Sequence, residues 1–329
     1  MDLLDRLGLQ HPIAQAGMGG GTSGAELAGA VSAAGGLGTV GITLAPQELH
    51  DQIVQARTLA PGRPIAANLL MPFVSMRHVQ ACVDGGADCV VLFCGFDRGL
   101  VQHLRAAGVV VLQQVGTCAQ AARALLDGAD GLIAQGIEAG GHLLGVEHGL
   151  DFLPSALEVA EGRPVLLAGG IAEAGDVRRA LTAGAVAAVA GTRFLLTEEC
   201  AAHPAYKQRV LGATETLETL LFGVGWHERH RVVPNLATER WCGSNPFGPR
   251  PVRAINRIAA PLLRRLPSSL SASALRMQRP SVPFYGPASI LLGMDERLVD
   301  VTPLYAGETA SRIDSIVPAA QAVRELAGA

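Results

Sequence analysis

The chain has 329 residues, of which 49% are hydrophobic, 17% charged and 4% aromatic, and its formal net charge at pH 7 is −3. This charge leaves no overall cationic surface to neutralise phosphates, which argues against a nucleic-acid binder. No apolar run approaches the roughly 20 residues of a membrane span, and the first residues lack the basic-then-apolar order of a signal peptide. We therefore expect a cytoplasmic protein that binds neither nucleic acid nor membrane.

Six cysteines are scattered along the sequence, without a Cys-x-x-Cys pair and without a histidine at ligand spacing. Zinc sites and disulfide frameworks both need cysteines at characteristic spacings. The sequence therefore predicts buried free thiols and no metal site.

One unit recurs along the first 200 residues: a short apolar run, a turn of small residues and an Ala/Leu-rich segment at helical spacing. Strands are expected at 12–16, 37–40, 65–70, 89–94, 109–115, 131–135, 165–168 and 187–190. Helices are expected at 25–34, 46–59, 75–84, 98–107, 117–127, 152–160 and 174–183. Because the strands are continuous apolar runs, both of their faces should be covered, as in a parallel sheet. Eight such units predict an α/β fold, a (β/α)8 TIM barrel.

The pattern loosens after residue 193. A helix is expected at 203–211, a less defined element at 215–221 and a C-terminal helix at 308–326. The segment 250–280 contains arginines and no acidic residue, which suits a lid, a dimer arm or a patch for an anionic substrate such as a nucleotide or CoA thioester. The alternative is a solvated helical arm. We expect residues 1–200 and 300–329 to form the barrel, and 201–299 to be an inserted, mostly helical lid or arm before the C-terminal helix.

The ends of the seventh and eighth expected strands suit a phosphate. Gly169, Gly170 and Gly191 can turn bare backbone N–H groups toward an anion, Thr192 adds a hydroxyl, and the helix that follows favours negative charge. A phosphate commonly sits at these two loops of a TIM barrel. This pairing predicts a phosphorylated cofactor or substrate without specifying which.

Small and amide residues mark other strand ends. The first strand is followed by Ala16, Gly17, Met18 and Gly19, which offer open backbone and one soft side chain. Asn68 ends an apolar strand, and a buried amide needs partners for both its carbonyl and its NH2 group. The pyrimidine edge of a flavin supplies the complementary set. Gln135, at the sixth strand end, would serve the same edge or the ribityl chain. For Gln135 and Asn68 alike, the alternative is an amide that braces its loop.

A glycine-rich stretch follows the sixth strand and ends in a histidine. Gly140 and Gly141 let the backbone approach a flat ligand closely, and His142 brings a titratable ring to that ligand. The alternative is a glycine-rich turn with a surface histidine.

Taken together, six motifs resemble the motif series of the nitronate monooxygenase family, which includes the related FMN-dependent enoyl reductases of fatty-acid synthesis. They are Gln15-Ala-Gly-Met-Gly19, Gly35-Gly-Leu-Gly38, Asn68-Leu69, Gln135-Gly-Ile-Glu-Ala-Gly-Gly-His142, Ala168-Gly-Gly-Ile171 and Gly191-Thr-Arg-Phe194. The resemblance spans residues 10–210 and returns at 304–308. It implies FMN bound without covalent attachment at the barrel mouth.

The resemblance also implies a role for each site residue. Met18 and Gly19 would lie beside the isoalloxazine, Asn68 would bond the ring edge, and Gln135 and Gly140 would line the flavin. The strand-end glycines and Thr192 would hold the phosphate. His142 would be the catalytic histidine, as a general base for a carbon acid or as a donor that orients a nitronate.

The leading hypothesis is an FMN-dependent monooxygenase that oxidises alkyl nitronates with O2. The alternatives are an NAD(P)H-dependent FMN reductase acting on a quinone or enoyl thioester, and a phosphate-binding barrel without redox function. Departures from the family pattern at Cys94, at Gln113-Gln114, after His142 and in the long insertion 226–287 bear on the choice of substrate. The sequence leaves open the physiological substrate, the use of NAD(P)H and whether the chain forms a homodimer.

Overall fold

The computed structural model describes residues 3–43, 45–263, 275 and 277–328. The chain packs into two compact units. The first comprises Met1–Ala139, Leu144–Ala201 and Ser315–Ala329, and the second comprises Gly140–Leu143 and Ala202–Asp314. The packing thus divides the chain at 201/202 and 314/315, where the sequence suggested 200/201 and 299/300. The functional roles expected for these ranges stay predictions.

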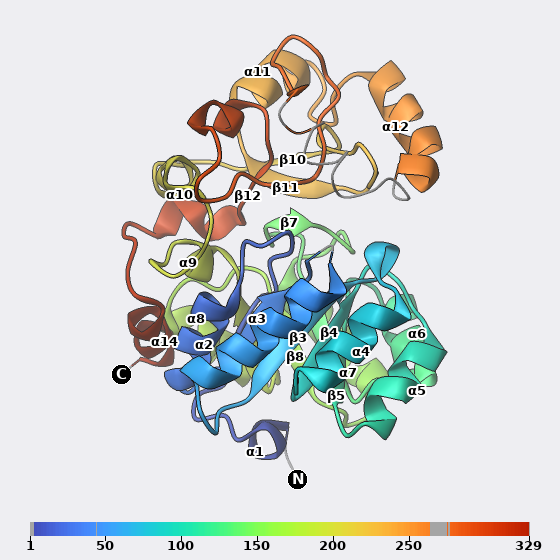
Figure 1. Ribbon diagram of the computed structural model, residues 1–329, viewed down its shortest axis with the longest axis vertical. Helices are drawn as coiled ribbons and strands as arrows, with labels where there is room; N and C mark the ends of the chain where they lie inside the picture. Colours follow the sequence, from blue (N-terminus) through green and yellow to red (C-terminus); the bar gives the residue numbers. More distant parts are fainter. Residues whose placement is uncertain (1–2, 44, 264–274, 276, 329) are drawn as a thin grey trace. The chain divides into compact units, whose positions relative to one another are not determined.

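The first unit contains an eight-stranded parallel sheet in the order β1-β9-β8-β6-β5-β4-β3-β2. Figure 1 labels β3, β4, β5 and β8 of this sheet. The strands are β1 Ile13–Gln15, β2 Gly38–Gly41, β3 Ile65–Leu70, β4 Cys89–Phe93, β5 Val110–Val115, β6 Gly131–Gln135, β8 Val165–Ala168 and β9 Ala187–Ala190. A parallel bridge joins Ala14 to Leu37, and the Gln15 N–H donates to the Leu37 carbonyl at 2.9 Å. The sheet therefore returns on itself next to β2, and the predicted TIM barrel is confirmed.

The helices of this unit alternate with the strands. They are α1 Leu3–Leu7, α2 Ala25–Ala33, α3 Pro46–Leu59, α4 Met76–Asp84, α5 Arg98–Ala106, α6 Cys118–Asp127, α7 Gly149–Ala160, α8 Ala174–Thr182, α9 Thr192–Leu195 and α14 Ala319–Ala327, with the 3-10 turn η1 at Met71–Phe73. Local signals explain where several of them begin and end. Thr117 caps α6 by accepting from the Gln120 N–H, and Gly128 ends it with φ 101°, a conformation that favours glycine.

Alternate residues of the strands serve two separate layers of core. In β3, Ala66 belongs to the cluster that fills the barrel, whereas its neighbour Ala67 packs in the layer between strands and helices. Leu3 and Leu7 of α1 join the inner cluster. Both faces of the strands are thus buried, which explains why the strands read as continuous apolar runs.

The second unit is built on a small antiparallel sheet in which β11 is central (Figure 1). Its strands are β7 Gly141–His142, β10 Leu217–Thr219, β11 His230–Val233 and β12 Leu304–Tyr305. Around the sheet lie α10 Pro204–Leu211, α11 Leu236–Cys242, α12 Arg250–Leu263, and the 3-10 turns η2 Glu296–Asp300 and η3 Glu308–Arg312. The helix expected at 203–211 corresponds to α10. The small sheet was not expected, because the sequence had suggested a mostly helical insertion.

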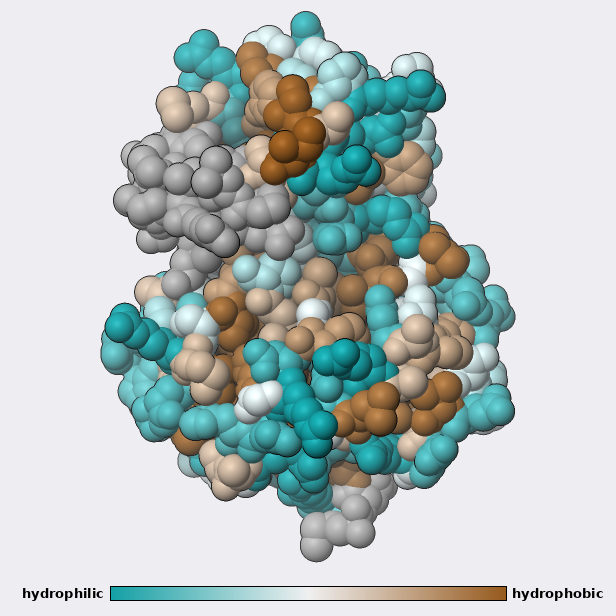
Figure 2. Space-filling view, turned by 90° about the vertical axis from the view of Figure 1, so that its right-hand side faces the viewer, coloured by the Kyte–Doolittle hydropathy of each residue, from teal (hydrophilic) through white to brown (hydrophobic). Residues whose placement is uncertain are grey.

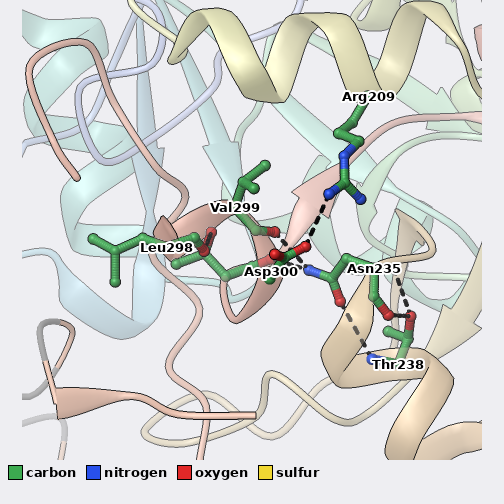
Figure 3. Close-up of polar contacts among 7 residues, drawn as sticks. Arg209, Asn235, Thr238, Leu298, Val299 and Asp300 are labelled. Carbon is green, nitrogen blue, oxygen red and sulfur yellow. Dashed lines mark hydrogen bonds and ion pairs between the residues drawn. The ribbon is translucent and has the colours of Figure 1, made fainter. Parts of the chain in front are cut away.

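One buried amide ties α11 to η2 in this unit (Figure 3). The Oδ1 atom of Asn235 caps α11 by accepting from the Thr238 N–H at 3.2 Å. Its Nδ2 atom donates to the carbonyls of Val299 and Thr302, each at 2.9 Å. Because Asn235 has no exposed surface, these contacts satisfy an amide that would be costly to bury alone.

The C-terminal segment differs from the expected single helix at 308–326. The structure has η3, then an extended stretch in which Val317 bridges Thr197, and then α14, preceded by Pro318 at its N-cap. Pro318 has no N–H to donate, and a residue that precedes a proline is biased toward extended backbone. The prediction was therefore wrong across residues 313–318.

The outer surface mixes residue types. On the face shown in Figure 2, hydrophobic residues lie in several groups between hydrophilic ones. In the described part of the chain, none of the helices has the length and apolar character needed to cross a membrane.

Candidate active site

Ten of the predicted site residues belong to the barrel. The residues 16–19, 169–170 and 191–192 directly follow β1, β8 and β9. Since β1 pairs with β9, and β9 with β8, the three loops leave one continuous part of the rim. The structure therefore brings the glycine-rich loops together, as the sequence predicted. Asn68 and Gln135 lie on β3 and β6 of the same sheet.

Gly17 and Asn68 lie against each other. A Cβ atom on Gly17 would fall 2.2 Å from the Cβ of Asn68, so only glycine fits there. The Nδ2 atom of Asn68 donates to the Val91 carbonyl at 3.3 Å. Its Oδ1 atom is buried and has no hydrogen-bond partner within the described residues. An acceptor buried in this way costs roughly 1–3 kcal/mol, and a ligand N–H would offset that cost. The pyrimidine edge of a flavin carries such a donor.

The loop after β1 is held by a residue that the sequence analysis missed. The Met18 N–H donates to the Ser23 Oγ at 3.0 Å, and the Ser23 hydroxyl lies 3.0 Å from the Thr39 carbonyl. A Cβ on Gly41 would fall 2.0 Å from the Met18 carbonyl oxygen, so β2 approaches this loop closely. The position of the Met18 backbone is thus fixed before any ligand binds.

The predicted phosphate loops have the backbone that such a site needs. Gly169 and Gly170 have φ values of 105° and 73°, in the region that favours glycine. A Cβ on Gly191 would meet only the Ala16 Cβ, at 3.7 Å, so the space beside this glycine is open. Thr192 is buried at the start of α9. These residues fit a phosphate on geometric grounds.

Glu138 is a further residue that the sequence analysis passed over. Its carboxylate accepts from the Gly149 N–H at the start of α7, at 3.0 and 3.1 Å, and lies 3.4 Å from the His148 ring. A Cβ on Gly169 would fall 3.2 Å from this carboxyl group. Gln135 acts similarly, because its Oε1 accepts from the Leu144 N–H at 3.0 Å. Both side chains brace the loop between β6 and α7.

Two departures from the family pattern meet at the end of β4. Cys94 adopts φ 61°, which is uncommon for a residue with a Cβ. The Nε2 atom of Gln113 lies 3.0 Å from the Leu92 carbonyl and 3.3 Å from the Gly95 carbonyl. Gln113 thus holds the turn that contains Cys94.

The other three predicted residues, Gly140, Gly141 and His142, belong to the second unit, because the chain leaves the barrel after Ala139 and returns at Leu144. A Cβ on Gly140 would fall 2.5 Å from the backbone carbonyl carbon of Ala306, and Gly141 has φ 77°. Within this unit, Gly140 therefore allows close backbone packing and Gly141 provides a backbone conformation that favours glycine. The ligand role expected for both glycines stays a prediction.

Three rings surround His142 in the second unit. The Trp226 ring stacks on it, with 3.5 Å between centroids and 14° between planes. The His230 and Tyr305 rings lie at 5.2 and 5.4 Å. His230 is also the register partner of His142 where β7 pairs with β11. Trp226 and His230 lie outside any periodic pattern, so no sequence signal indicated them, whereas Tyr305 lies in the segment 304–308 where the family resemblance returns.

This cluster is uncharged near neutral pH. Burial, and then the nearby His230, hold the pKa of His142 well below 6.5. Burial lowers the pKa of His230 to about 4. The His230 Nδ1 lies 2.9 Å from the Glu228 carbonyl, so this nitrogen carries the proton of the neutral ring. Burial also raises the pKa of Tyr305, whose hydroxyl donates to the Pro287 carbonyl at 3.0 Å. His142 is therefore a neutral imidazole in an apolar, aromatic environment.

Known proteins resemble this chain in sequence. The model of the nitronate monooxygenase family matches residues 2–81 and 73–328. A Mycobacterium tuberculosis protein, (3aS,4S,5R,7aS)-5-hydroxy-7a-methyl-1-oxo-octahydro-1H-indene-4-carboxyl-CoA dehydrogenase, is 33% identical over 64% of this chain and 60% of its own. The nitronate monooxygenase of Pseudomonas aeruginosa is 30% identical over 63% of this chain and 72% of its own. The chain thus spans about 60% of the length of the first of these relatives.

Solved structures share the fold over almost the whole chain. FabK from Thermotoga maritima has a TM-score of 0.77 and 26% identity, covering 98% of this chain and 94% of that one. The nitroalkane oxidase from Streptomyces ansochromogenes has a TM-score of 0.76 and 26% identity, covering 99% and 96%. Nitronate monooxygenases and FabK enzymes depend on FMN. The match of the family model to nearly all of its residues shows that this chain belongs to the nitronate monooxygenase family.

Proposed function

We propose that the chain is an FMN-dependent oxidoreductase that oxidises alkyl nitronates with O2, and that His142 removes the α-proton when the substrate is a neutral nitroalkane. The observation that carries the proposal is His142 itself, an imidazole kept neutral by burial and stacked on Trp226. Family membership supports the same chemistry. We further propose a small-molecule substrate as partner and the cytoplasm as location.

The barrel residues would hold the cofactor. Asn68 would accept a hydrogen bond from the ring edge of FMN at its buried Oδ1. Gly169, Gly170, Gly191 and Thr192 would bind the phosphate through backbone N–H groups and one hydroxyl. Alongside them we assign Ala16, Gly17, Met18, Gly19, Gln135, Gly140 and Gly141 to the cofactor site. Bound FMN would supply the redox chemistry between the substrate and O2.

His142 would contribute proton transfer and position. A base must be unprotonated to act, and the lowered pKa of His142 keeps its ring neutral at pH 7. After the α-proton moves to a ring nitrogen, the imidazolium would face the π-surface of Trp226, which favours a cation. The nitronate formed at the same time is an anion and would stabilise that imidazolium further.

A second candidate is an NAD(P)H-dependent FMN reductase acting on an enoyl thioester or a quinone. It is favoured by the likeness to FabK and by the CoA ester named for the Mycobacterium tuberculosis relative. In this reaction the histidine would help to bind the substrate without removing a proton.

Anaerobic titration of the yellow holoenzyme separates the candidates. The proposal predicts that an alkyl nitronate bleaches the flavin absorbance and that O2 restores it, without NAD(P)H. Bleaching by NADH or NADPH, with none by nitronate, would favour the reductase. A colourless protein that gains no thermal stability from added FMN would indicate a phosphate-binding barrel without redox function.

A further inference from the structure

Helix α12 of the second unit carries arginines without counter-charges. Arg250, Arg253 and Arg257 lie on it, and no acidic residue does. Four other arginines of the unit have carboxylates close by: Arg209–Asp300 at 3.0 Å, Arg229–Glu218 at 2.8 Å, Arg231–Glu308 at 3.2 Å and Arg297–Asp295 at 2.5 Å. Within the described residues, the three α12 arginines form no ion pair. Their positive charges are therefore available to pair with an anion that is not part of the described chain.

Two buried polar atoms on α12 and one on His227 also lack a hydrogen-bond partner within the described residues. The Arg253 Nε, Asn256 Nδ2 and His227 Nδ1 atoms have no hydrogen-bond partner among the residues that the structure describes. Asn256 and Arg257 lie three and four positions after Arg253, so each of them neighbours Arg253 on the helix surface. Asn256 is only 1% exposed. Each buried donor without an acceptor carries a free-energy cost that a bound acceptor removes.

His227 faces the same arginines. The positive charges of Arg253 and Arg257, after burial, lower the pKa of His227, which shows that the three groups are close together. A Cβ on Gly223 would fall 3.2 Å from the His227 Nδ1, so the glycine leaves room for this ring. Two guanidinium groups and an imidazole therefore lie close together, and Asn256 neighbours Arg253 on the same helix.

A basic helix face in solvent is the simpler interpretation. It accounts for Arg257, which is exposed, but not for donors that are buried away from water. Guanidinium groups with an additional neutral donor form the set that binds phosphate oxygens, because each oxygen can accept several hydrogen bonds. A carboxylate offers fewer acceptor positions and less charge than a phosphate monoester or diphosphate.

We propose that Arg253, Arg257, Asn256 and His227 form a binding site for a phosphate group carried by the substrate or cosubstrate of this enzyme. Within the second unit, the site is linked to His142, since His227 follows Trp226, the residue that stacks on His142. The phosphate belongs to a CoA thioester or to a nicotinamide dinucleotide. The identification of the ligand as a substrate rests on the proposed function, whereas the phosphate site itself does not.

Binding to the FMN-saturated holoenzyme tests the site, because bound FMN blocks its own phosphate loops. Calorimetry with pyrophosphate, CoA and NADPH should give saturable binding of at least one probe. Arg253→Gln/Arg257→Gln should weaken it about a hundredfold, and Asn256→Leu about tenfold, since charge-assisted contacts exceed neutral ones. Arg297→Gln removes a 90% exposed arginine side chain from the same unit and should change binding less than about twofold.

The choice between CoA and NADPH identifies the source of the phosphate. Absence of saturable binding with all three probes would overturn the proposal, as would wild-type affinity in the double arginine variant or in Asn256→Leu. Flavin content and circular dichroism of each variant establish that it is folded. Flavin bleaching by nitronate is measured on the same samples. Bleaching without probe binding contradicts only the phosphate site, and probe binding without bleaching contradicts only the proposed reaction.

Discussion

At the scale of single residues, the proposed chemistry depends on an imidazole that burial keeps uncharged. Burial and His230 lower the pKa of His142, and Trp226 covers one face of its ring. Since the neutral form is the one that accepts a proton, the acid side of the pH profile for nitroalkane oxidation should lie below pH 6.5.

His142→Asn separates proton removal from substrate orientation. The amide cannot act as a base near neutral pH, so turnover of neutral nitroalkanes should fall by about 10²–10⁴, the contribution of a general base. Turnover of preformed nitronates should fall much less, because no proton has to be removed. Steady-state O2 consumption measures both, on enzyme with its full FMN content. Equal slowing of the two substrates would show that His142 only orients them.

Tryptophan fluorescence reports the protonation of the His142 ring. The chain has two tryptophans, so Trp241→Phe leaves Trp226 as the only reporter. A protonated imidazole stacked on an indole quenches its emission, and the lowered pKa places this quenching below pH 6.5. A titration of the single-tryptophan protein gives the midpoint. The same titration with His142→Asn added should lose this transition, and a midpoint above 6.5 would contradict a buried neutral ring.

At the scale of elements, the loop after β1 packs closely against β3 because Gly17 has no side chain. Gly17→Ala would place a Cβ 2.2 Å from the Asn68 Cβ, so the loop or the strand must move. Such overpacking costs about 1–3 kcal/mol, and here it also displaces the residue proposed to bind the flavin edge. We expect weaker FMN binding, measured by absorbance after dialysis.

Gly175→Ala is the matched control. Its Cβ would have the nearest atom at 3.5 Å, in the first turn of α8, where alanine is a better helix former than glycine. This variant should keep its FMN and be slightly more stable. Equal loss of FMN from both variants would show that the effect is not specific to Gly17.

The sequence predicted elements best where both faces of a strand are buried. The bounds of β3, β6, β8 and β9 agree with the expected ranges, because a mostly apolar run of four to six residues between turn signals identifies a buried strand. The strands of the second unit have two to four residues, too few for periodicity to appear. His230, the first residue of β11, was missed for the same reason, and Trp226 lies in the loop between β10 and β11, which has no periodic pattern either. Pro318 indicated the break before α14. A single helix was nevertheless expected there, because the residues on both sides follow a helical pattern.

At the scale of the whole molecule, the buried histidines make stability depend on pH. The pKa of His230 is about 4 in the folded chain and about 6.5 when unfolded. As the pH falls below 6.5, the unfolded chain gains a proton that the folded chain does not, so the free energy of unfolding decreases until about pH 4. For His230 alone, this amounts to about 3 kcal/mol. His142 adds to the loss in the same direction.

Urea unfolding at pH 7.5 and pH 4.5 measures this difference. Carboxylates also respond to acid, so the comparison is between the wild type and His230→Gln, which keeps a polar side chain that does not titrate. The variant should lose less stability between the two pH values than the wild type does. An identical loss in both proteins would mean that His230 is not buried as a neutral ring.

All three rings around His142 come from one uninterrupted length of chain, residues 202–314, whereas the eight barrel strands lie outside it. Exchanging that length for the corresponding one of another family member would alter the surroundings of the histidine in a single step, without editing any strand of the barrel. Such chimeras are a direct way to move reactivity toward new substrates, because residues 202–314 can be varied while the barrel strands and the loops proposed to bind FMN stay unchanged.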